Sequence, residues 1–485
     1  MATKKDLVEA YSFSRRRLVT AFLSGAPGGR EVEPSRPGRA IIGGIALAVL
    51  LVAGAAVLRV LKSPIEIDWD TEMLVSEKES GADYVYIAPL DSDDLELRPV
   101  ANITSAMLLL GSDVQPTVVP HDEIARKNRG EGIGILQAPE TPPASADLLQ
   151  SGWTACTGRS GATSLGIRAS VTSAPDVRTL DGVNFVVRSE ADELFLIAVS
   201  PVGAASGPRA YSYAVPEGRT ADGILQAVAG TSVDTAVPVP DEWLELFPAG
   251  APLTLSSFGL RSADLGSPSD VSGQPGMPDR VRVGDTITVD SATYLVRADD
   301  ILALDSFAAE VYLNLDFPRG RQPEPRAAQA RPPGTIVDGS QLPGAFWPVD
   351  VATDVDQPDE LCAQLLTGES AEPRVVLGTP TPGSAASAVD VPAGPPVPVV
   401  ESGHGAFVLA GDWDVVGPAS RTLIDDRGFA YPVSSAVEQD RLGYATVPPV
   451  VVPDAWIELF SDGVPLSVDA ARCPPTSEAK AKPCG

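Results

Sequence analysis

The feature that most constrains this chain is an uninterrupted apolar stretch near its N-terminus. Nineteen residues, Ala40 to Leu58, contain no charged and no strongly hydrogen-bonding side chain, and Arg39 and Arg59 flank them. At about 1.5 Å per residue, a helix of this length spans roughly 28 Å, close to the hydrocarbon thickness of a bilayer. The stretch therefore predicts one transmembrane helix over residues 40–61. A buried core helix or a signal peptide is the alternative, but no clear cleavage pattern ends the stretch.

Charge on the two sides of the apolar stretch predicts its orientation. Residues 1–39 contain eight basic and four acidic side chains, whereas the segment after Lys62 soon becomes acidic. The positive-inside rule places the short N-terminus in the cytoplasm. The total of −28, less the N-terminal +4 and the +2 of Arg59 and Lys62, leaves −34 on residues 63–485. This acidic region argues against a nucleic-acid ligand and against docking of the same region on anionic lipid.

Two surfaces near the membrane are candidates for docking. Residues 1–39 predict an amphipathic helix, opened by an approximate capping box of Thr3 and Asp6, and then a polar linker. The basic residues of this helix are placed to meet lipid phosphates or an acidic partner, unless they form only a solvated face. The residues concerned are Arg15, Arg16 and Arg17, beside the apolar Leu18 and Phe22. Small residues in the apolar stretch offer a contact for a neighbouring helix: Gly44, Ala48 and Gly54.

The region beyond the membrane contains an internal duplication. VPDEWLELFPAGAPL, from Val239 to Leu253, recurs as VPDAWIELFSDGVPL, from Val452 to Leu466, and ten of the fifteen positions coincide. An agreement that includes tryptophan and proline is not expected by chance. In each copy we expect Pro-Asp to open and cap a short helix, and Gly-x-Pro to end it.

A fainter likeness extends the duplication to two tandem halves. The segments that begin at Tyr84 and Thr293 each predict a strand, an acidic turn, a second strand and a helix. Cys156 and Cys362 are 206 residues apart, and a Gly-bearing turn and a strand follow each. We therefore expect halves at roughly 80–256 and 280–470, with residues 262–280 as a linker.

The four cysteines lie beyond the predicted membrane helix, where an oxidising compartment permits disulfides. Four cysteines allow three pairings, and the sequence alone does not choose among them. If the halves pack about a pseudo-twofold axis, the two central cysteines occupy equivalent places and meet near it. Our hypothesis is that Cys156 pairs with Cys362, and Cys473 with Cys484.

The sequence offers little for catalysis or for a metal. His121 and His404 are the only histidines, and both are predicted in loops, so a zinc site of the usual kind has poor support. No Gly-Lys dipeptide occurs, which excludes a P-loop. Gly130-x-Gly132-x-Gly134 is better explained as a turn before a strand over 133–136. The paired carboxylates Asp93-Asp94 and Asp425-Asp426 fall in predicted turns. We expect no catalytic residue, no cofactor and no metal.

Several short motifs together resemble the EccB family, the single-pass membrane component of type VII (ESX) secretion systems in actinobacteria. The N-terminal helix, the VEPSRPGR linker and segments of the acidic region all take part, so the resemblance covers essentially the whole chain. The motifs are Tyr11-x-Phe13-x-x-Arg16-Arg17-Leu18, Leu97-Arg98-Pro99-Val100-Ala101-Asn102, Arg129-Gly130-Glu131-x-Ile133-Gly134, Trp153-Thr154-x-Cys156 and Val283-Gly284-Asp285. Cys473 and Cys484 fall outside this pattern.

The resemblance implies an α+β fold: a cytoplasmic helix, one transmembrane helix and an elongated extracytoplasmic region of duplicated repeat domains around a β-rich core that holds one disulfide. The boundaries we expect are 1–39, 40–61, 62–82 (linker), 83–145 (repeat 1), 146–178 (core, first part), 179–256 (repeat 2), 257–336 (linker and repeat 3), 337–395 (core, second part), 396–470 (repeat 4) and 471–485 (tail).

The same resemblance implies a structural subunit of a secretion complex in the inner membrane. Implied partners are EccC, EccD, EccE and MycP-type subunits, further copies of the chain, and the membrane itself. The family has been credited with ATP hydrolysis, which no motif in this sequence supports. An ATPase with an unrecognised nucleotide site and a cell-wall-binding module are the alternative functions.

Overall fold

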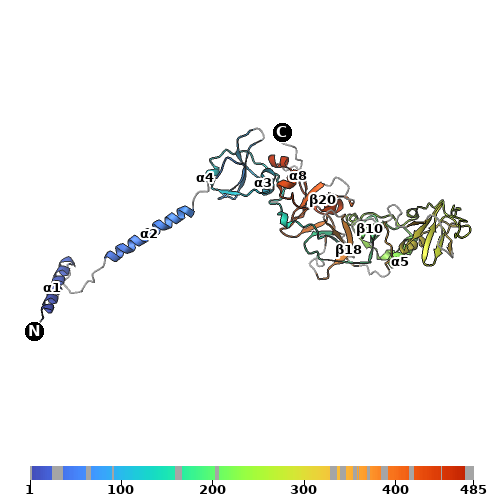
Figure 1. Ribbon diagram of the computed structural model, residues 1–485, viewed down its shortest axis with the longest axis horizontal. Coiled ribbons are helices and arrows are strands. Elements are labelled where there is room, and N and C mark those ends of the chain that lie inside the picture. The colour runs from blue at the N-terminus through green and yellow to red at the C-terminus, as the bar shows by residue number, and fades with distance from the viewer. Residues whose placement is uncertain are drawn as a thin grey trace. The chain divides into compact units, whose positions relative to one another are not determined.

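The computed structural model describes residues 3–24, 37–61, 67–89, 92–158, 166–201, 207–327, 336–338, 346–352, 358, 360–368, 372–383, 391–413, 420–448 and 450–475. The chain divides into two compact units, residues 1–69 and residues 70–485 (Figure 1).

The first unit contains two helices, α1 (Lys4–Ser24) and α2 (Pro37–Leu61). Half of the predicted capping box at the start of α1 is present, because the backbone N–H of Thr3 donates to Asp6 Oδ2 at 2.9 Å. The Thr3 hydroxyl also donates to Asp6 Oδ2, at 2.7 Å, and the N–H of Asp6 donates to the backbone oxygen of Thr3. Over the residues described, no helix combines the length and the hydropathy needed to cross a membrane.

Four sheets of the second unit share one strand order, with three antiparallel strands in sequence and a short fourth strand parallel to the first. We call them repeat sheets 1 to 4. Repeat sheet 1 is β1 (Met73–Glu77), β2 (Asp83–Ile87), β3 (Glu96–Pro99) and β4 (Thr117–Val119). Repeat sheet 2 is β8 (Asn184–Arg188), β9 (Leu194–Ser200), β10 (Arg209–Ala214) and β11 (Val237–Pro238).

The other two sheets add a fifth strand, parallel to the third. Repeat sheet 3 is β12 (Thr286–Val289), β13 (Ala292–Val296), β14 (Ile301–Leu304), β15 (Pro325–Ala327) and β16 (Ile336–Asp338). Repeat sheet 4 is β20 (Ala406–Gly411), β21 (Ser420–Ile424), β22 (Phe429–Val433), β23 (Val451–Pro453) and β24 (Ser461–Asp462).

One helix follows the third strand of each repeat sheet: α3 (Ile103–Leu110), α5 (Arg219–Ala229), α7 (Ser306–Leu313) and α8 (Ala436–Arg441). Three of these helices begin at a polar N-cap residue whose side chain accepts a backbone N–H of the first turn: Asn102, Asp305 and Ser435. Short helices follow further along: α4 (His121–Ile124), α6 (Asp241–Leu244), α9 (Asp454–Ile457), α10 (Val468–Arg472), and the 3₁₀ turns 145–147, 233–235 and 255–258.

A fifth, central sheet combines strands from both halves in the order β19-β6-β5-β17-β18-β7. The first half supplies β5 (Trp153–Thr157), β6 (Ile167–Val171) and β7 (Val177–Thr179), and the second half supplies β17 (Cys362–Leu366), β18 (Arg374–Pro380) and β19 (Val397–Val400). The edge strands are exchanged, because β7 pairs with β18 of the second half and β19 pairs with β6 of the first. The two halves therefore cannot separate without breaking this sheet.

Three hydrophobic cores connect the five sheets. One core joins the central sheet to repeat sheets 2 and 4. A second joins repeat sheet 2 to repeat sheet 3, with α5 against α7. A third joins repeat sheet 1 to repeat sheet 4, with α3 and α8 side by side (Figure 1). The mixed α+β fold is thus confirmed, and the duplication extends to four copies of one topology.

Three local expectations differ from the structure. The segment 62–82, expected as a linker, contains β1. Residues 262–280, also expected as a linker, bury Val271 and Met277 in a core with β12 and β13. Only Ile133 of the segment 133–136 makes a β-bridge, so no strand forms there. Polar and glycine-rich composition thus hid structured segments at 62–82 and 262–280, and a short apolar run at 133–136 was too short a pattern to predict a strand.

Candidate docking surfaces and the bridged core

The predicted central disulfide is present between Cys156 and Cys362. These residues lie directly opposite each other on the antiparallel strands β5 and β17, and their Cα atoms are 4.1 Å apart. Both side chains are buried. The bridge therefore joins the middle strands of the two halves and closes the chain around repeat sheets 2 and 3.

Arg168 is the neighbour of this bridge on β6, directly opposite Cys156. It is buried, and burial lowers the pKa of its guanidinium while Glu360 and Asp176 oppose that change. A cation near the bridge is thus balanced by acidic groups of both halves.

Of the two tail cysteines, the structure describes Cys473. Cys473 is disulfide-bonded, whereas Cys484 lies outside the described residues, so the predicted pair stays a prediction.

The two tryptophans of the duplicated motif lie in the core that joins the central sheet to repeat sheets 2 and 4. Trp243 and Trp456 are 0% and 1% exposed. The indole N–H of Trp243 donates to the backbone oxygen of Ala155 in β5 at 3.1 Å, and that of Trp456 donates to the backbone oxygen of Leu246, inside the other copy, at 3.3 Å. The two copies therefore contact each other as well as the central sheet.

The prediction for the start of these helices was partly wrong. Pro240 and Pro453 occupy the N-cap positions and make no side-chain cap, and the aspartates are the first helical residues. The Asp241 carboxylate instead accepts the backbone N–H of Glu190. Burial, followed by Asp412, raises the pKa of Asp454.

The shared glycine of the motif is explained by a close approach to a tyrosine ring. A Cβ atom at Gly250 would lie 2.2 Å from the ring of Tyr213, and one at Gly463 would lie 2.5 Å from the ring of Tyr431. A methyl group has no space at either site, so the glycine is a packing requirement.

A long-range seam holds repeat sheet 1 against repeat sheet 4. The Arg441 guanidinium, at the end of α8, donates through Nη1 to the backbone oxygens of Leu108, at 2.8 Å, and Leu109, at the end of α3. The Tyr444 hydroxyl donates to the oxygen of Pro143 at 2.7 Å, and the N–H of Gly134 donates to the oxygen of Cys473. The C-terminal carbonyls of α3 are therefore satisfied by a residue more than three hundred positions away.

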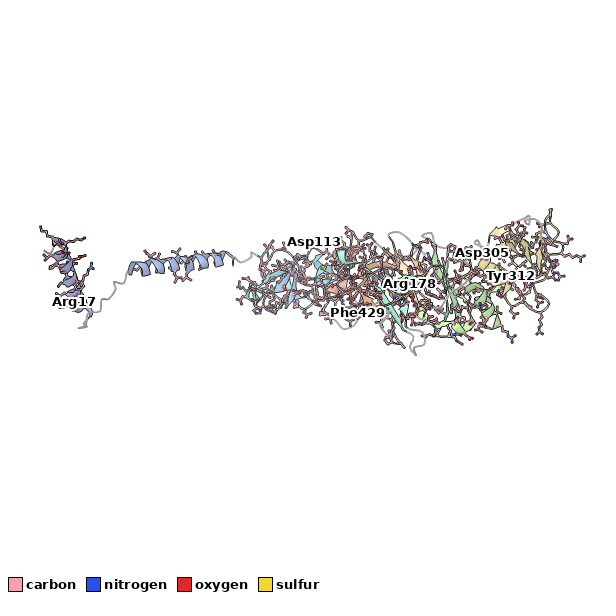
Figure 2. All side chains as sticks on the ribbon, turned by 90° about the horizontal axis from the view of Figure 1, so that it is seen from below. Arg17, Asp113, Arg178, Asp305, Tyr312 and Phe429 are labelled. Carbon is pink, nitrogen blue, oxygen red and sulfur yellow. A yellow bond between two sulfur atoms is a disulfide. The ribbon has the colours of Figure 1, made fainter. Side chains whose placement is uncertain are left out.

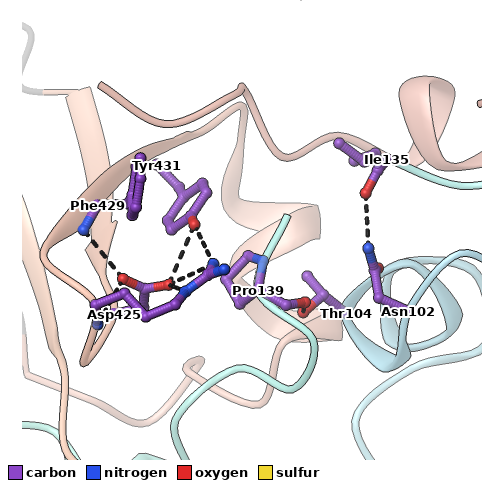
Figure 3. Close-up of polar contacts among 8 residues, drawn as sticks. Asn102, Thr104, Ile135, Pro139, Asp425, Phe429 and Tyr431 are labelled. Carbon is purple, nitrogen blue, oxygen red and sulfur yellow. Dashed lines mark hydrogen bonds and ion pairs between the residues drawn. The ribbon is translucent and has the colours of Figure 1, made fainter. Parts of the chain in front are cut away.

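A pocket of about 320 Å³ opens beside this seam. Its lining combines the segment 139–144 with residues 403, 404 and 425–427. The buried Asp425 accepts hydrogen bonds from Arg427, from the Phe429 N–H and from the Tyr431 hydroxyl (Figure 3). The carboxylate oxygens of Asp425 thus bond to residues within six positions of it, so Asp425 stabilises the local structure. Asp425-Asp426 does lie in a turn, as predicted.

The histidines do not assemble a reactive site. His121 begins α4 rather than lying in a loop, and its Nδ1 is 2.5 Å from Glu77 Oε1. The Ser80 hydroxyl, and then His121, lower the pKa of Glu77. His404 Nδ1 lies 3.2 Å from the backbone oxygen of Ser402 and 4.0 Å from Glu401 Oε1. Among the residues described, no three His, Cys, Asp or Glu side chains come together as a metal site.

The predicted docking residues lie on α1 and α2. Leu18 and Phe22 are 63% and 89% exposed, and Arg15 and Arg16 are exposed as well. Arg17, labelled in Figure 2, is also exposed. Gly44 and Gly54 have no heavy atom within 4 Å of an added Cβ, and Ala48 is exposed. Their role in docking stays a prediction.

Sequence reasoning missed the residues that build the seam. Arg441 and Tyr444 follow no motif, and their partners are remote backbone oxygens. A third copy of the Pro-helix motif was detectable in principle, because Val119-Pro120 precedes α4 as Val239-Pro240 precedes α6. Its tryptophan position holds Glu123, which hid the likeness.

Residues 1–475 match the family described as "Type VII secretion system ESX-1, transport TM domain B". A protein of Mycolicibacterium smegmatis (strain MKD8), named "ESX-1 secretion system ATPase EccB1", is 27% identical over 455 residues, which cover 89% of this chain and 87% of the relative. One of Mycobacterium tuberculosis (strain ATCC 25618 / H37Rv), named "ESX-5 secretion system ATPase EccB5", is 24% identical over 493 residues, covering 95% and 91%.

Solved structures share the fold. A chain of an intact ESX-5 inner membrane complex has a TM-score of 0.59 at 20% identity, with 97% of this chain and 95% of that chain covered. A chain of an EccB3 dimer from the ESX-3 core complex has a TM-score of 0.58 at 20% identity, covering 82% and 99%. Because the family match spans almost the whole sequence, this chain belongs to the EccB family of type VII secretion systems.

Proposed function

We propose that the chain is a structural core subunit of a type VII secretion membrane complex, which anchors and shapes the extracytoplasmic side of that complex for protein export. The family match over residues 1–475 carries this proposal. The architecture supports it, because four repeat sheets and a central sheet share buried cores.

The proposal includes a single-pass topology. In it, residues 40–61 of α2, which contain one basic residue between Ala40 and Val60, cross the inner membrane. Residues 1–39 lie in the cytoplasm and residues 70–485 outside. The disulfide between Cys156 and Cys362 supports the outside location, because such bridges persist in oxidising compartments.

The proposed partners are EccC, EccD, EccE and MycP-type subunits together with further copies of the chain. Support comes from relatives: one similar chain was solved within an ESX-5 inner membrane complex, and another as an EccB3 dimer. In this arrangement α1 and the small residues of α2 contact neighbours, through Leu18, Phe22, Gly44, Ala48 and Gly54.

Native electrophoresis of detergent-solubilised membranes, with mass spectrometry of co-purifying proteins, tests the proposal. We expect the wild-type chain in a large assembly, and we expect Leu18→Asp/Phe22→Asp to leave residues 70–485 folded but outside that assembly. A wild-type chain that migrates alone would refute the structural role. A double variant that remains in the full assembly would refute the docking role alone.

A further inference from the structure

The pocket beside the seam lies between two walls that come from distant parts of the chain. Residues 139–144, which follow repeat sheet 1, form the first wall. The second wall is formed by residues 403 and 404, in the turn before β20, and by residues 425–427, in the turn before β22. The volume of about 320 Å³ falls within the range of small-ligand sites, about 300–1,000 Å³. The pocket is thus large enough for a small ligand that touches both walls.

Hydrogen bonds from both repeats hold the first wall. The Thr104 hydroxyl, in α3, donates to the backbone oxygen of Pro139 (Figure 3). The Tyr444 hydroxyl, which follows α8, donates to the backbone oxygen of Pro143 at 2.7 Å. A wall that is already ordered loses little conformational entropy when a ligand binds, which favours binding.

The second wall is held by the buried carboxylate of Asp425. This carboxylate accepts the Tyr431 hydroxyl at 3.1 Å, and its Oδ2 lies 2.7 Å from Nη2 of Arg427 (Figure 3). Arg427 is the one arginine or lysine among the described residues that line the pocket, and Asp425 balances its charge. The lining therefore offers an anionic ligand no uncompensated arginine or lysine.

Two further carboxylates of the lining lack such a partner. Glu140, exposed on the first wall, makes no ion pair and no side-chain hydrogen bond with the described residues. Asp426, exposed on the second wall, accepts the Gly403 N–H at 3.3 Å. Between these carboxylates the first wall presents three prolines and an alanine of the segment 139–144. Each wall thus carries one negative charge that is open to a ligand, and the first wall is otherwise largely apolar.

We propose that this pocket binds a primary ammonium group on an aliphatic stem, with the ammonium toward Glu140 and Asp426 and the stem against the prolines. An ammonium group supplies the hydrogen-bond donors that the two carboxylates lack, and a methylene stem covers apolar surface while its head stays polar. An anion would meet two uncompensated negative charges, and an uncharged apolar ligand would bury the carboxylates without a partner.

Two sources carry this group: a free aliphatic amine and the lysine side chain of another protein. Both would make the same contacts with Glu140 and Asp426. Because these residues stand on walls that follow repeat sheet 1 and belong to repeat sheet 4, either source would also hold the two repeats together. The inference does not depend on the secretion role proposed above.

Calorimetric titration of the purified full-length chain in detergent tests the chemistry of the ligand. The probes are Nα-acetyl-lysine amide, which models a lysine side chain, and the free diamine cadaverine. Nα-acetyl-norleucine amide, which has an aliphatic stem without the ammonium group, is the matched control ligand. We expect both amines to bind and the norleucine compound not to bind. Absence of binding by both amines would overturn the proposal.

A pair of variants with equal loss of charge separates the pocket from the overall acidity of the chain. Glu140→Gln/Asp426→Asn should weaken the binding of both amines about ten-fold or more, since two ion pairs are lost and each amide keeps the shape of the carboxylate. Asp93→Asn/Asp94→Asn, at exposed positions that do not line the pocket, should bind both amines as the wild type does. Equal affinity of the two variants would overturn the proposal, because the amines would then follow net charge alone.

Cross-linking in native membranes distinguishes the two sources. A carbodiimide joins a carboxylate directly to an amine that contacts it. A cross-link from Glu140 or Asp426 to a lysine of another protein would support the proposal and assign the ligand to that lysine. Amine binding that requires Glu140 and Asp426, without such a cross-link, would support the proposal and assign the ligand to a free amine. Amine binding that persists unchanged in Glu140→Gln/Asp426→Asn would place the amine elsewhere and overturn the proposal.

Discussion

Replacement of Arg441, the last residue of α8, should loosen α3 without unfolding repeat sheet 4. Its guanidinium donates to the last carbonyls of α3, those of Leu108 and Leu109, across the seam between repeat sheets 1 and 4. A hydrogen bond from a charged donor contributes about 1.5–3 kcal/mol, and two bonds from one nitrogen are not fully additive. We therefore expect Arg441→Met, which keeps much of the apolar stem, to cost about 2–4 kcal/mol of local stability.

Hydrogen exchange followed by mass spectrometry measures this cost, because local opening can be read without global unfolding. The amides of α3 should exchange roughly thirty-fold to several-hundred-fold faster, since about 1.4 kcal/mol is a factor of ten. The matched control is Arg421→Met. Arg421 lies in β21 of repeat sheet 4, and its Nε donates to Gln439 Oε1 at 2.8 Å, so its replacement should leave α3 unchanged. Wild-type exchange of α3 in Arg441→Met would refute the reasoning.

The remaining predictions concern packing, the bridge, pH and ATP. Gly463→Ala should destabilise the chain by about 1–3 kcal/mol, because its Cβ would meet the Tyr431 ring, whereas Gly132→Ala, with its nearest neighbour at 3.7 Å, should be tolerated; denaturant melts compare the two. Cys156→Ser/Cys362→Ser should lower the free energy of unfolding by about 5 kcal/mol, since the bridge spans 206 residues. Non-reducing peptide mapping should also find Cys473 joined to Cys484. Either central cysteine joined to a tail cysteine would contradict this pairing. The pKa of Glu77 is lowered in the fold, so the ionised Glu77 stabilises the folded state fully above the pKa of an unfolded glutamate, about 4.3, and this stabilisation is lost as pH falls through the lower folded pKa. The difference in melting temperature between wild type and Glu77→Gln should therefore shrink on acidification. A difference that grows would reject the pairing of Glu77 with His121. ATP hydrolysis by purified protein should decline with further purification, and a rate that persists and is lost on one point substitution would show otherwise.

Local patterns predicted the elements whose information is local. The apolar stretch predicts the helix α2, Thr3 and Asp6 predict the start of α1, and the β-branched segments near Tyr84 and Thr293 predict strand, strand and helix in both halves. The equivalence of Cys156 and Cys362 followed from the duplication, since equivalent positions in two like halves meet at their common axis. These inferences hold because the same chemical pattern produces the same local structure wherever it recurs.

Only the tertiary structure shows which repeat sheets pack against each other. Nothing in the sequence says that repeat sheet 1 packs on repeat sheet 4, that β7 and β19 exchange places in the central sheet, or that Arg441 caps α3. Each of these contacts joins residues far apart in sequence. The Arg441 guanidinium, moreover, donates to backbone oxygens, which every residue carries. Sequence alone therefore predicted the helix α2, the duplication and, as a hypothesis, the central bridge. The tertiary structure decided which repeats share a core, because shared burial depends on the assembled surfaces and not on any local pattern.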